Sequence, residues 1–393
     1  MAKLIDITGK ALSGEWGTDD ENGNGIPVLR TTNFTNEGVV NYNDVVTRTI
    51  TKKNIDDKFL RKGDIIIEKS GGSDKFPVGR VIYFDGDEKT YLFNNFTGLL
   101  RVKNQNVWYP RYVFYSLYAN YKRGGTRVYE NKTTGLHNLK TDDYVSRYEV
   151  AEVDKTDQIS ICEKLDKVFE IIKLREQELQ LLDNLIKARF VEMFGTLNSP
   201  SHEFTKATLK ELCNKITDGK HGGCKVEKGT ERYFVGAREI YDDEVHYDTA
   251  PEINVDEFEK DYKRCNIEIG DFLIVNTGAT IGKSAITTDE RTEHTLLQKS
   301  VALLKLKKEL LDPVFLKWCY RVNTQMYMVE SASAQPNLLI SKINSTVIYV
   351  PDMELQNQFA DFVHQVDKSK VAVQKALNET QILFDSLMQK YFG

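Results

Sequence analysis

Residues 154–195 read DKTDQISICEKLDKVFEIIKLREQELQLLDNLIKARFVEMFG and contain neither Pro nor Gly before Gly195. Apolar side chains recur there at every seventh position, at Leu165, Ile172, Leu179, Ile186 and Met193. A seven-residue apolar repeat is typical of a helix that packs along another helix as a coiled coil. The pattern therefore predicts one long helix, which stops at Gly195 because glycine favours the left-handed conformation of a helix end.

A second copy of this stretch occupies residues 352–393 and also ends in Phe-Gly. Its apolar positions include Val366, Val373, Leu377 and Phe384. Antiparallel packing of the two helices would bury these side chains against Leu165, Ile172, Leu179 and Ile186 of the first helix. The alternative is that each helix packs on its own domain or on another chain. Roughly 35 helical residues would span on the order of 50 Å, so the pair would act as a spacer.

The parts of the chain that precede the two helices match one another in a constant order. Residues 63–67 (GDIII) match 270–274 (GDFLI), Gly79-Arg80 matches Gly282-Lys283, and Pro110 matches Pro313. Each copy begins with short strand-like runs, continues with a helix opened by Pro, and adds one more strand before the long helix. The sequence thus predicts an α+β fold with an internal pseudo-twofold repeat. Its segments are two globular domains, 1–153 and 196–351, and two long helices, 154–195 and 352–393.

Composition excludes several classes of protein. The 393 residues are 40% hydrophobic and 28% charged, as in an ordinary soluble protein of two or three domains. No apolar run is long enough to span a membrane and no secretory signal is evident, so a cytoplasmic protein is expected. The five cysteines lie far apart without a C-x-x-C spacing. Neither a disulfide framework nor a structural zinc site is therefore expected.

Candidate catalytic motifs are incomplete. Residues 278–284 (GATIGKS) have three residues between the glycines, where a phosphate-binding P-loop has four, which favours a simple turn between strands. Asp64 and Asp271 follow Gly in matched positions, but without the spacing of a metal-dependent nuclease site they are better read as turn caps. The six histidines form no spaced cluster. We therefore predict no catalytic residue and no metal site.

A local basic stretch indicates nucleic-acid binding, although the whole chain carries a net charge of −5. Residues 101–140 contain eight basic side chains and the single acid Glu130, and a basic loop, 122–127 (KRGGTR), follows the predicted helix. Such charge is typical of a surface that binds DNA phosphates, and the alternative is a merely solvated loop. The aromatic residues Trp108, Tyr112, Tyr115, Tyr118 and Tyr121 have helical spacing and are expected in the core.

The second half has a comparable loop at residues 217–223. Side chains able to bind phosphates or bases occur in both halves. The predicted DNA-binding residues are Arg30, Lys69, Arg80, Asn94, Lys122, Arg123, Arg127 and Lys132 in the first half, and Lys220, His221, Arg238, Lys283, Gln298, Arg321 and Gln335 in the second. Because the loops differ while the strands match, two DNA half-sites of unlike sequence are expected.

Two variable globular halves, each followed by a long helix, resemble the specificity subunit of type I restriction-modification enzymes. The Gly-Asp strands, the glycine turns and the Asp312 to Leu316 segment (DPVFL) carry the resemblance over nearly the whole chain. It implies a non-catalytic subunit in which domains 1–153 and 196–351 each recognise half of a split, asymmetric DNA target. The helices would set the gap between the half-sites.

The same resemblance implies partners and their cofactors. Two modification subunits would methylate adenine with S-adenosylmethionine, and two restriction subunits would use ATP and Mg²⁺ to cut unmethylated DNA such as that of a phage. No cofactor is implied for this chain. Two alternatives remain at this point: a specificity subunit of a type IIB-like system, or a coiled-coil scaffold that binds proteins instead of DNA.

Overall fold

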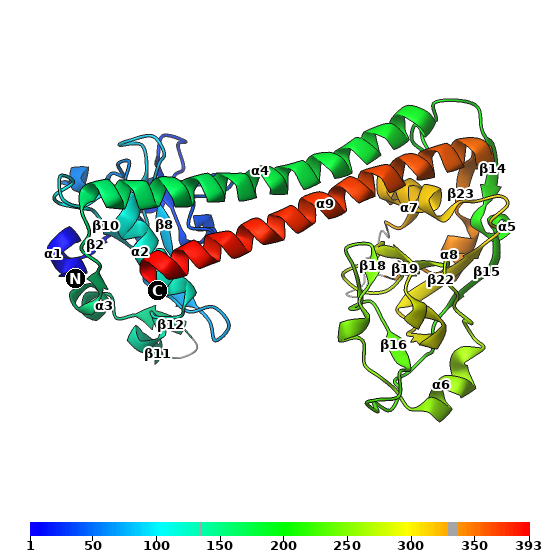
Figure 1. Ribbon diagram of the computed structural model, residues 1–393. Coiled ribbons are helices and arrows are strands. Elements are labelled where there is room, and N and C mark those ends of the chain that lie inside the picture. The colour runs from blue at the N-terminus through cyan, green and yellow to red at the C-terminus, as the bar shows by residue number, and fades with distance from the viewer. Residues whose placement is uncertain (134–135, 329–336) are drawn as a thin grey trace. The chain divides into compact units, whose positions relative to one another are not determined.

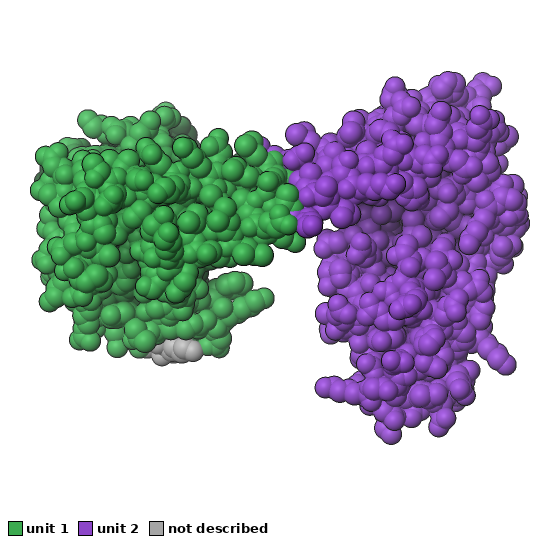
Figure 2. All heavy atoms as spheres, in the orientation of Figure 1, with its two compact units in different colours: residues 1–175, 376–393 green, residues 176–375 purple. Residues whose placement is uncertain are grey.

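The computed structural model describes residues 1–133, 136–328 and 337–393, and these form two compact units. Unit 1 contains Met1–Arg175 and Ala376–Gly393, and unit 2 contains Glu176–Lys375 (Figure 2). The long helices are α4, Lys155–Phe194, and α9, Met353–Phe392 (Figure 1). Both boundaries between the units fall inside these helices. No helix in the described parts of the chain is long and apolar enough to cross a membrane.

The two long helices begin and end within one residue of the predicted ranges, and they pack antiparallel in each unit. In unit 1, the rings of Phe169 (α4) and Phe384 (α9) lie 6.1 Å apart, and Arg175 donates to the carbonyl of Ala376. In unit 2, the rings of Phe190 (α4) and Phe359 (α9) lie 5.3 Å apart. Residue numbers in α4 rise as those of the contacted residues in α9 fall. The antiparallel pairing is therefore confirmed.

The predicted packing residues face both the opposite helix and the globular parts. Leu165, Ile172, Ile186, Val366 and Phe384 are buried. Leu179, Val373 and Leu377 are half-buried. Leu165 and Ile172 belong to the core of unit 1 together with Tyr112, and Ile186 belongs to the core of unit 2 together with Phe315. Packing on the opposite helix and packing on a globular domain were posed as alternatives, and the helices do both.

In its described residues, unit 1 has short strands and three α-helices before α4. Its strands are β1 Ala2–Lys3, β2 Leu12–Ser13, β3 Thr18–Asp19, β4 Ile26–Leu29, β5 Val46–Thr49, β6 Ile65–Glu68, β7 Ser70–Gly72, β8 Val81–Tyr83, β9 Leu92–Phe93, β10 Thr97–Leu100, β11 Glu130–Thr133, β12 Leu136–Leu139 and β13 Glu149–Val150. Its helices are α1 Leu4–Thr8, α2 Pro110–Lys122 and α3 Thr141–Arg147. The main sheets have the orders β2-β10-β6-β8, β3-β5-β4-β9 and β11-β12-β7.

Unit 2 repeats the plan between α4 and α9. Its strands are β14 Thr205–Thr208, β15 Cys213–Asp218, β16 Tyr233–Val235, β17 Ile240–Tyr241, β18 Glu244–Val245, β19 Phe272–Val275, β20 Ser284–Ile286, β21 Thr295–Leu297, β22 Val301–Leu306 and β23 Val347–Val350. Its helices are α5 Leu209–Leu212, α6 Val255–Tyr262, α7 Pro313–Val322 and α8 Ile340–Ser345. The four-stranded sheet β15-β22-β19-β20 corresponds to β2-β10-β6-β8 of unit 1.

Further equivalences confirm the internal repeat. The pair β4 and β9 is parallel, and so is the pair β16 and β21. The first strand of each unit pairs with the strand before the long helix, β1 with β13 and β14 with β23. The helices opened by Pro, α2 and α7, occupy the predicted positions, and the aromatic side chains of and before α2 (Trp108, Tyr112, Tyr115, Tyr118, Tyr121) are buried as expected.

The carboxylates of Asp64 and Asp271 cap matching turns, as predicted. Asp64 accepts a hydrogen bond of 2.8 Å from the backbone N–H of Arg61, and Asp271 accepts one of the same length from Glu268. The glycines before them have φ angles of 91° and 92°, which side chains rarely adopt. Residues 278–283 likewise form the turn between the antiparallel strands β19 and β20, as predicted in preference to a P-loop.

Two buried glutamines fasten the long helices to their own units. The amide N–H₂ of Gln158 donates to the carbonyls of Val107 and Val153 at 3.0 and 2.9 Å, and its oxygen accepts from the N–H of Tyr109 at 2.8 Å. Gln356 makes the equivalent bonds. Its partners are the carbonyls of Leu310 and Pro351 and the N–H of Asp312. Each glutamine thus joins the first turn of a long helix to the loop before α2 or α7.

Replacing Gln158 with Leu is expected to lower the free energy of unfolding of unit 1 by about 3 kcal/mol, because three buried backbone groups lose their partner. Gln356→Leu should do the same to unit 2. Urea unfolding of the full chain measures both effects, with the exposed Gln177→Leu on α4 as the control. An unfolding profile of Gln158→Leu that matched the control would contradict this role.

Candidate nucleic-acid interface

One end of each four-stranded sheet gathers the predicted DNA-binding side chains. In unit 1 it is formed by the end of β6 and the starts of β8 and β10, and in unit 2 by the end of β19 and the starts of β20 and β22. We call it the loop end of each unit. The predicted residues at the loop ends are Arg30, Lys69, Arg80 and Asn94 in unit 1, and Lys220, Arg238, Lys283 and Gln298 in unit 2.

In unit 1 the parallel pair β4 and β9 brings Arg30 and Asn94 together. Asn94 follows β9, and its backbone N–H donates to the carbonyl of Leu29, which directly precedes Arg30, at 2.9 Å. The guanidinium of Arg30 lies 2.9 Å from the carboxylate of Asp44. Lys69 follows β6, and its ammonium donates to the hydroxyl of Ser13 at 3.0 Å. These side chains are therefore held in place by contacts within unit 1.

Arg80 stabilises the backbone at the loop end of unit 1. Its guanidinium donates to the carbonyls of Phe34 and Thr31 at 2.8 and 2.9 Å and lies 3.4 Å from the carboxylate of Glu68. Burial raises the pKa of Glu68, and the neighbouring guanidinium opposes that shift. Arg80 thus positions the turn around it, a structural role that the sequence did not indicate.

Several buried polar atoms at this loop end have no hydrogen-bond partner among the described residues. They are Arg30 Nε, Arg80 Nε, Asn94 Oδ1 and Thr126 Oγ1. Thr126 belongs to the basic loop and packs against Gly79, where a Cβ would lie 2.7 Å from its methyl group. Buried polar atoms are nearly always paired in proteins. The loop end of unit 1 therefore has unused hydrogen-bonding capacity.

The basic loop after α2 borders a surface hollow of about 410 Å³. Lys122 and Arg127 are exposed there, and Arg127 donates to the carbonyl of Asp74 at 3.3 Å. Arg123 is exposed too, but its guanidinium donates to the carbonyl of Phe392 at the C-terminus of α9. A cation at this position stabilises a helix end. Lys122 and Arg127 are thus the better placed members of the loop for contact with phosphates.

Two side chains that the sequence did not single out, Lys75 and Phe76, also line this hollow. Phe76 is 52% exposed, and the ammonium of Lys75 lies 5.3 Å from its ring centroid. The loop that carries them is anchored, because the backbone N–H of Val78 donates to the carboxylate of Glu130 at 2.9 Å. An adjacent Lys-Phe pair between Gly71-Gly72 and Pro77 was the available sequence signal.

In unit 2, Gln298 directly follows strand β21 and therefore lies at the loop end. The backbone N–H of Gln298 donates to the carbonyl of Val235 at 2.8 Å, and the N–H of Lys220 donates to Leu297 at 2.7 Å. The side chain of Gln298 packs against Gly236, where a Cβ would lie 2.5 Å from Gln298 Oε1. Lys220 and Gln298 therefore lie next to one another, as Arg30 and Asn94 do in unit 1.

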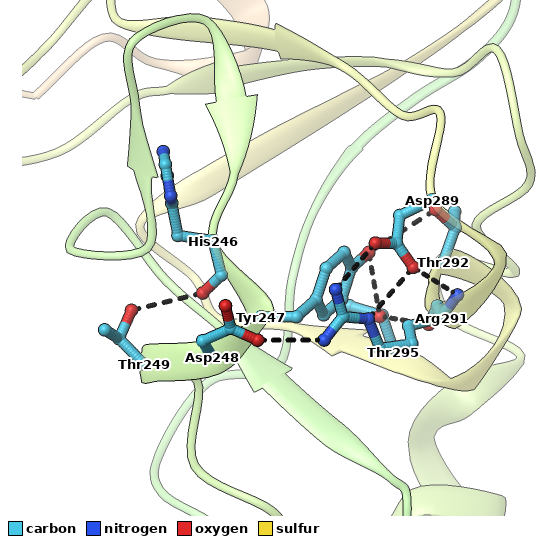
Figure 3. Close-up of polar contacts among 8 residues, drawn as sticks. All are labelled: His246, Tyr247, Asp248, Thr249, Asp289, Arg291, Thr292 and Thr295. Atoms are coloured by element: carbon cyan, nitrogen blue, oxygen red, sulfur yellow. Dashed lines mark hydrogen bonds and ion pairs between the residues drawn. The ribbon is translucent and has the colours of Figure 1, made fainter. Parts of the chain in front are cut away.

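A polar cluster around the buried side chains of Tyr247, Thr292 and Thr295 holds the segment that precedes β21 (Figure 3). The guanidinium of Arg291 lies 2.7 Å from the carboxylate of Asp289, 3.2 Å from that of Asp248 and 4.8 Å from the ring centroid of Tyr247. Thr295 donates to the Tyr247 hydroxyl at 3.2 Å. The hydrogen bond to Arg291 lowers the pKa of Asp289, which keeps the carboxylate charged. This cluster fixes β21 and, through it, Gln298.

Other predicted residues of unit 2 lie beside the carboxylates of acidic side chains. The ammonium of Lys220 lies 2.6 Å from the carboxylate of Asp261, and His221 lies 3.0 Å from that of Asp218. Arg321 forms an ion pair with Asp243. Arg238 and Lys283 are exposed. The two exposed cations are therefore the stronger candidates for phosphate contact in unit 2.

Two predicted residues cannot be placed: the side chain of Lys132, in β11, and the whole of Gln335 lie outside the described residues. Over the described ranges, no group of three or more His, Cys, Asp or Glu side chains could hold a metal ion. Cations, amides and an exposed aromatic ring at the loop ends are the side chains with which proteins contact DNA phosphates and bases.

Removing the ring of Phe76 by Phe76→Ala is expected to weaken binding to the target DNA by about 1–3 kcal/mol, because an exposed phenyl ring gains about that much when it is buried against base edges. The dependence of affinity on salt should stay the same, since no charge is lost. Titrations of target DNA at several salt concentrations measure both quantities, with the exposed Leu174→Ala on α4 as the control. An unchanged affinity for the target would exclude base contact by Phe76.

Comparison with known proteins agrees with this geometry. The family model described as the type I restriction modification DNA specificity domain matches residues 1–184 and again residues 201–380. A comparison with curated proteins found no match. The two matches cover most of the chain, which belongs to this family of type I DNA specificity proteins. The chain is a DNA target-recognition subunit with one specificity domain in each half.

Solved structures show the same fold. The S subunit of a type I restriction-modification system from M. genitalium is 17% identical, with a TM-score of 0.54, over 100% of this chain and 95% of that one. A chain from a study of complex assembly and conformational transition of the type I R-M system is 14% identical, with a TM-score of 0.58, over 100% of this chain and 96% of that one. The predicted α+β architecture with an internal repeat is thereby confirmed.

Proposed function

We propose that each loop end reads one half of a split, asymmetric DNA target and that the long helices set the number of base pairs between the halves. One observation carries the proposal. The two loop ends are built from equivalent strands but carry unlike side chains, since Asn94 in unit 1 occupies the position of Gln298 in unit 2. The exposed Lys283 of unit 2 likewise stands where unit 1 has Arg80, whose guanidinium is bonded within the fold. Equivalent frames with different side chains are suited to different bases.

We further propose that this chain performs no covalent chemistry and directs partner subunits to the target. Membership of this family supports the proposal that the partners are two modification subunits, which methylate adenine with S-adenosylmethionine, and two restriction subunits, which use ATP and Mg²⁺. Action on cellular and phage DNA would place the complex in the cytoplasm. A type IIB-like system, in which cutting and methylation are fused in one partner, would use the same two DNA readers.

The test is co-expression of the chain with a modification subunit of the same system, followed by single-molecule sequencing of the host DNA. A split motif with methyladenine in each half is expected. Exchanging residues 26–100 for those of a relative should change one half of the motif and leave the other unchanged. A complex that forms but methylates no motif and ignores DNA at low salt would instead support a protein-binding scaffold.

A further inference from the structure

The sheet end opposite to the loop end in unit 1, where β6 begins and β10 ends, carries a second basic surface. A hollow of about 810 Å³ opens there. Its basic lining residues are Lys10, Arg61, Lys62, Arg101 and Lys103, and among the described residues Asp64 alone contributes a carboxylate to the lining. Arg101 already neutralises Asp64 through hydrogen bonds of 2.7 and 2.6 Å. We call this surface the basic hollow.

The remaining cations of the basic hollow are available to a ligand. Lys10, Arg61, Lys62 and Lys103 are exposed and form no ion pair with any described residue. Their backbone is fixed, because the N–H of Arg61 is capped by Asp64 and the N–H of Lys103 donates to the carbonyl of Ile7 at 3.0 Å. Four unpaired positive charges around one hollow create a positive potential that attracts anions.

Unit 2 shows that the fold does not require the charges of Arg61 and Lys62. In the equivalent turn, Glu268 and Ile269 occupy the positions of Arg61 and Lys62. There the ammonium of Lys305, which matches Arg101, lies 3.1 Å from the carboxylate of Glu268 and 2.9 Å from that of Asp271. The lysine of this turn is therefore matched by carboxylates in unit 2, whereas the turn of unit 1 keeps the two unpaired cations Arg61 and Lys62. This difference points to a ligand of the basic turn in unit 1.

We propose that the basic hollow binds phosphates of the DNA duplex that flanks the half-site held at the loop end of unit 1. Beside its cations, the hollow presents the exposed side chains of Asn104, Gln105 and Asn106, and amides are common phosphate donors. Leu12 and Val102 are its only aliphatic lining residues. Protein partners need an apolar interface core, whereas DNA-binding surfaces are polar and strongly positive.

The dimensions allow one duplex to reach both surfaces of unit 1. The strand β6, four residues long, separates the basic hollow from the loop end, a distance on the order of 13 Å. One turn of B-DNA is about 34 Å long. This inference rests on the proposed function and adds to it: the loop end reads bases, and the basic hollow holds adjacent backbone without reading sequence.

The test uses the full chain in complex with its modification subunits and two duplexes, one with a short and one with a long flank next to the half-site of unit 1. The variant is Arg61→Gln with Lys62→Gln. On the long duplex, the slope of log affinity against log salt should fall by about 1.8, and affinity at 0.15 M salt by roughly 30-fold. On the short duplex, the salt slope and the affinity should change little. The preference for the target over a scrambled sequence should persist.

A second variant, Arg61→Glu with Lys62→Ile, carries the residues that unit 2 has in the same turn and should show a larger loss. The control is Lys260→Gln with Lys263→Gln, two exposed lysines at α6. An unchanged salt slope with intact target preference would overturn only the proposal that the basic hollow binds DNA. Loss of the modification subunits without a change in slope would also overturn it, because that result would indicate that the hollow binds an acidic protein. Absence of target preference in the unaltered complex would overturn the proposed function itself.

Discussion

The triple variant Lys75→Glu, Lys122→Glu and Arg127→Glu is expected to lose at least about 100-fold in affinity for duplex DNA at 0.15 M salt, because each phosphate contact releases counterions worth about 0.7 log unit there. These three exposed cations surround the hollow beside the basic loop of unit 1. Arg123 is left unchanged because it donates to the carbonyl of Phe392, so that its loss would also disturb the end of α9.

Fluorescence anisotropy of labelled duplex, titrated at several salt concentrations, measures the loss. The slope of log affinity against log salt should fall by roughly 2.7, and equally for target and unrelated DNA, since phosphate contacts carry no sequence information. The control replaces Lys228, Lys260 and Lys263, exposed lysines of unit 2, with Glu. An affinity equal to that of the control would mean that the basic loop is merely solvated, the alternative that the sequence left open.

Replacing Phe194 with Ala is expected to destabilise unit 2 by about 3–5 kcal/mol, the usual cost of removing a fully buried aromatic side chain. Phe194 is 0% exposed at the end of α4. Its ring centroid lies 5.0 Å from those of Phe190 and Phe315 and 5.5 Å from that of Phe359. Removing the ring would leave a cavity where α4, α7 and α9 meet.

The repeat supplies a matched control for this substitution. Phe392 ends α9 as Phe194 ends α4, but it is only half-buried, with its ring 5.1 Å from that of Tyr112. Phe392→Ala should therefore cost less than half as much. Urea unfolding followed by circular dichroism compares the two variants. Equal losses would show that burial at these two positions is not what stabilises the helix ends.

Regular local patterns made most of the fold predictable from the sequence. The apolar repeat of α4 and the Pro at the start of α2 and α7 are properties of neighbouring residues, so α4 was predicted to within one residue, and α2 and α7 begin at the predicted Pro. The order of matched motifs predicted the internal repeat. Such features depend on short-range preferences, which sequence expresses directly.

The candidate site was only partly predictable, because long-range contacts decide which cations remain available. Arg123 meets the carbonyl of Phe392, and Lys220 meets Asp261 on α6. Nothing in the sequence near these residues indicates those partners. The role of Gln158 was not predicted for the same reason, since it hydrogen-bonds three backbone groups that come together only when the chain folds. Lys75 and Phe76 were missed because a short exposed loop has no periodic pattern.

The make-up of unit 1 has a consequence for synthesis on the ribosome. Unit 2 is one continuous segment, Glu176–Lys375, whereas unit 1 joins Met1–Arg175 to Ala376–Gly393. Phe384 and Met388 belong to the core of unit 1 with Leu165 and Ile172. During translation, unit 2 can complete its core while that of unit 1 still lacks its last side chains. Unit 1, whose synthesis begins first, is thus expected to complete its folding last. It is expected to depend on chaperones until α9 has left the ribosome.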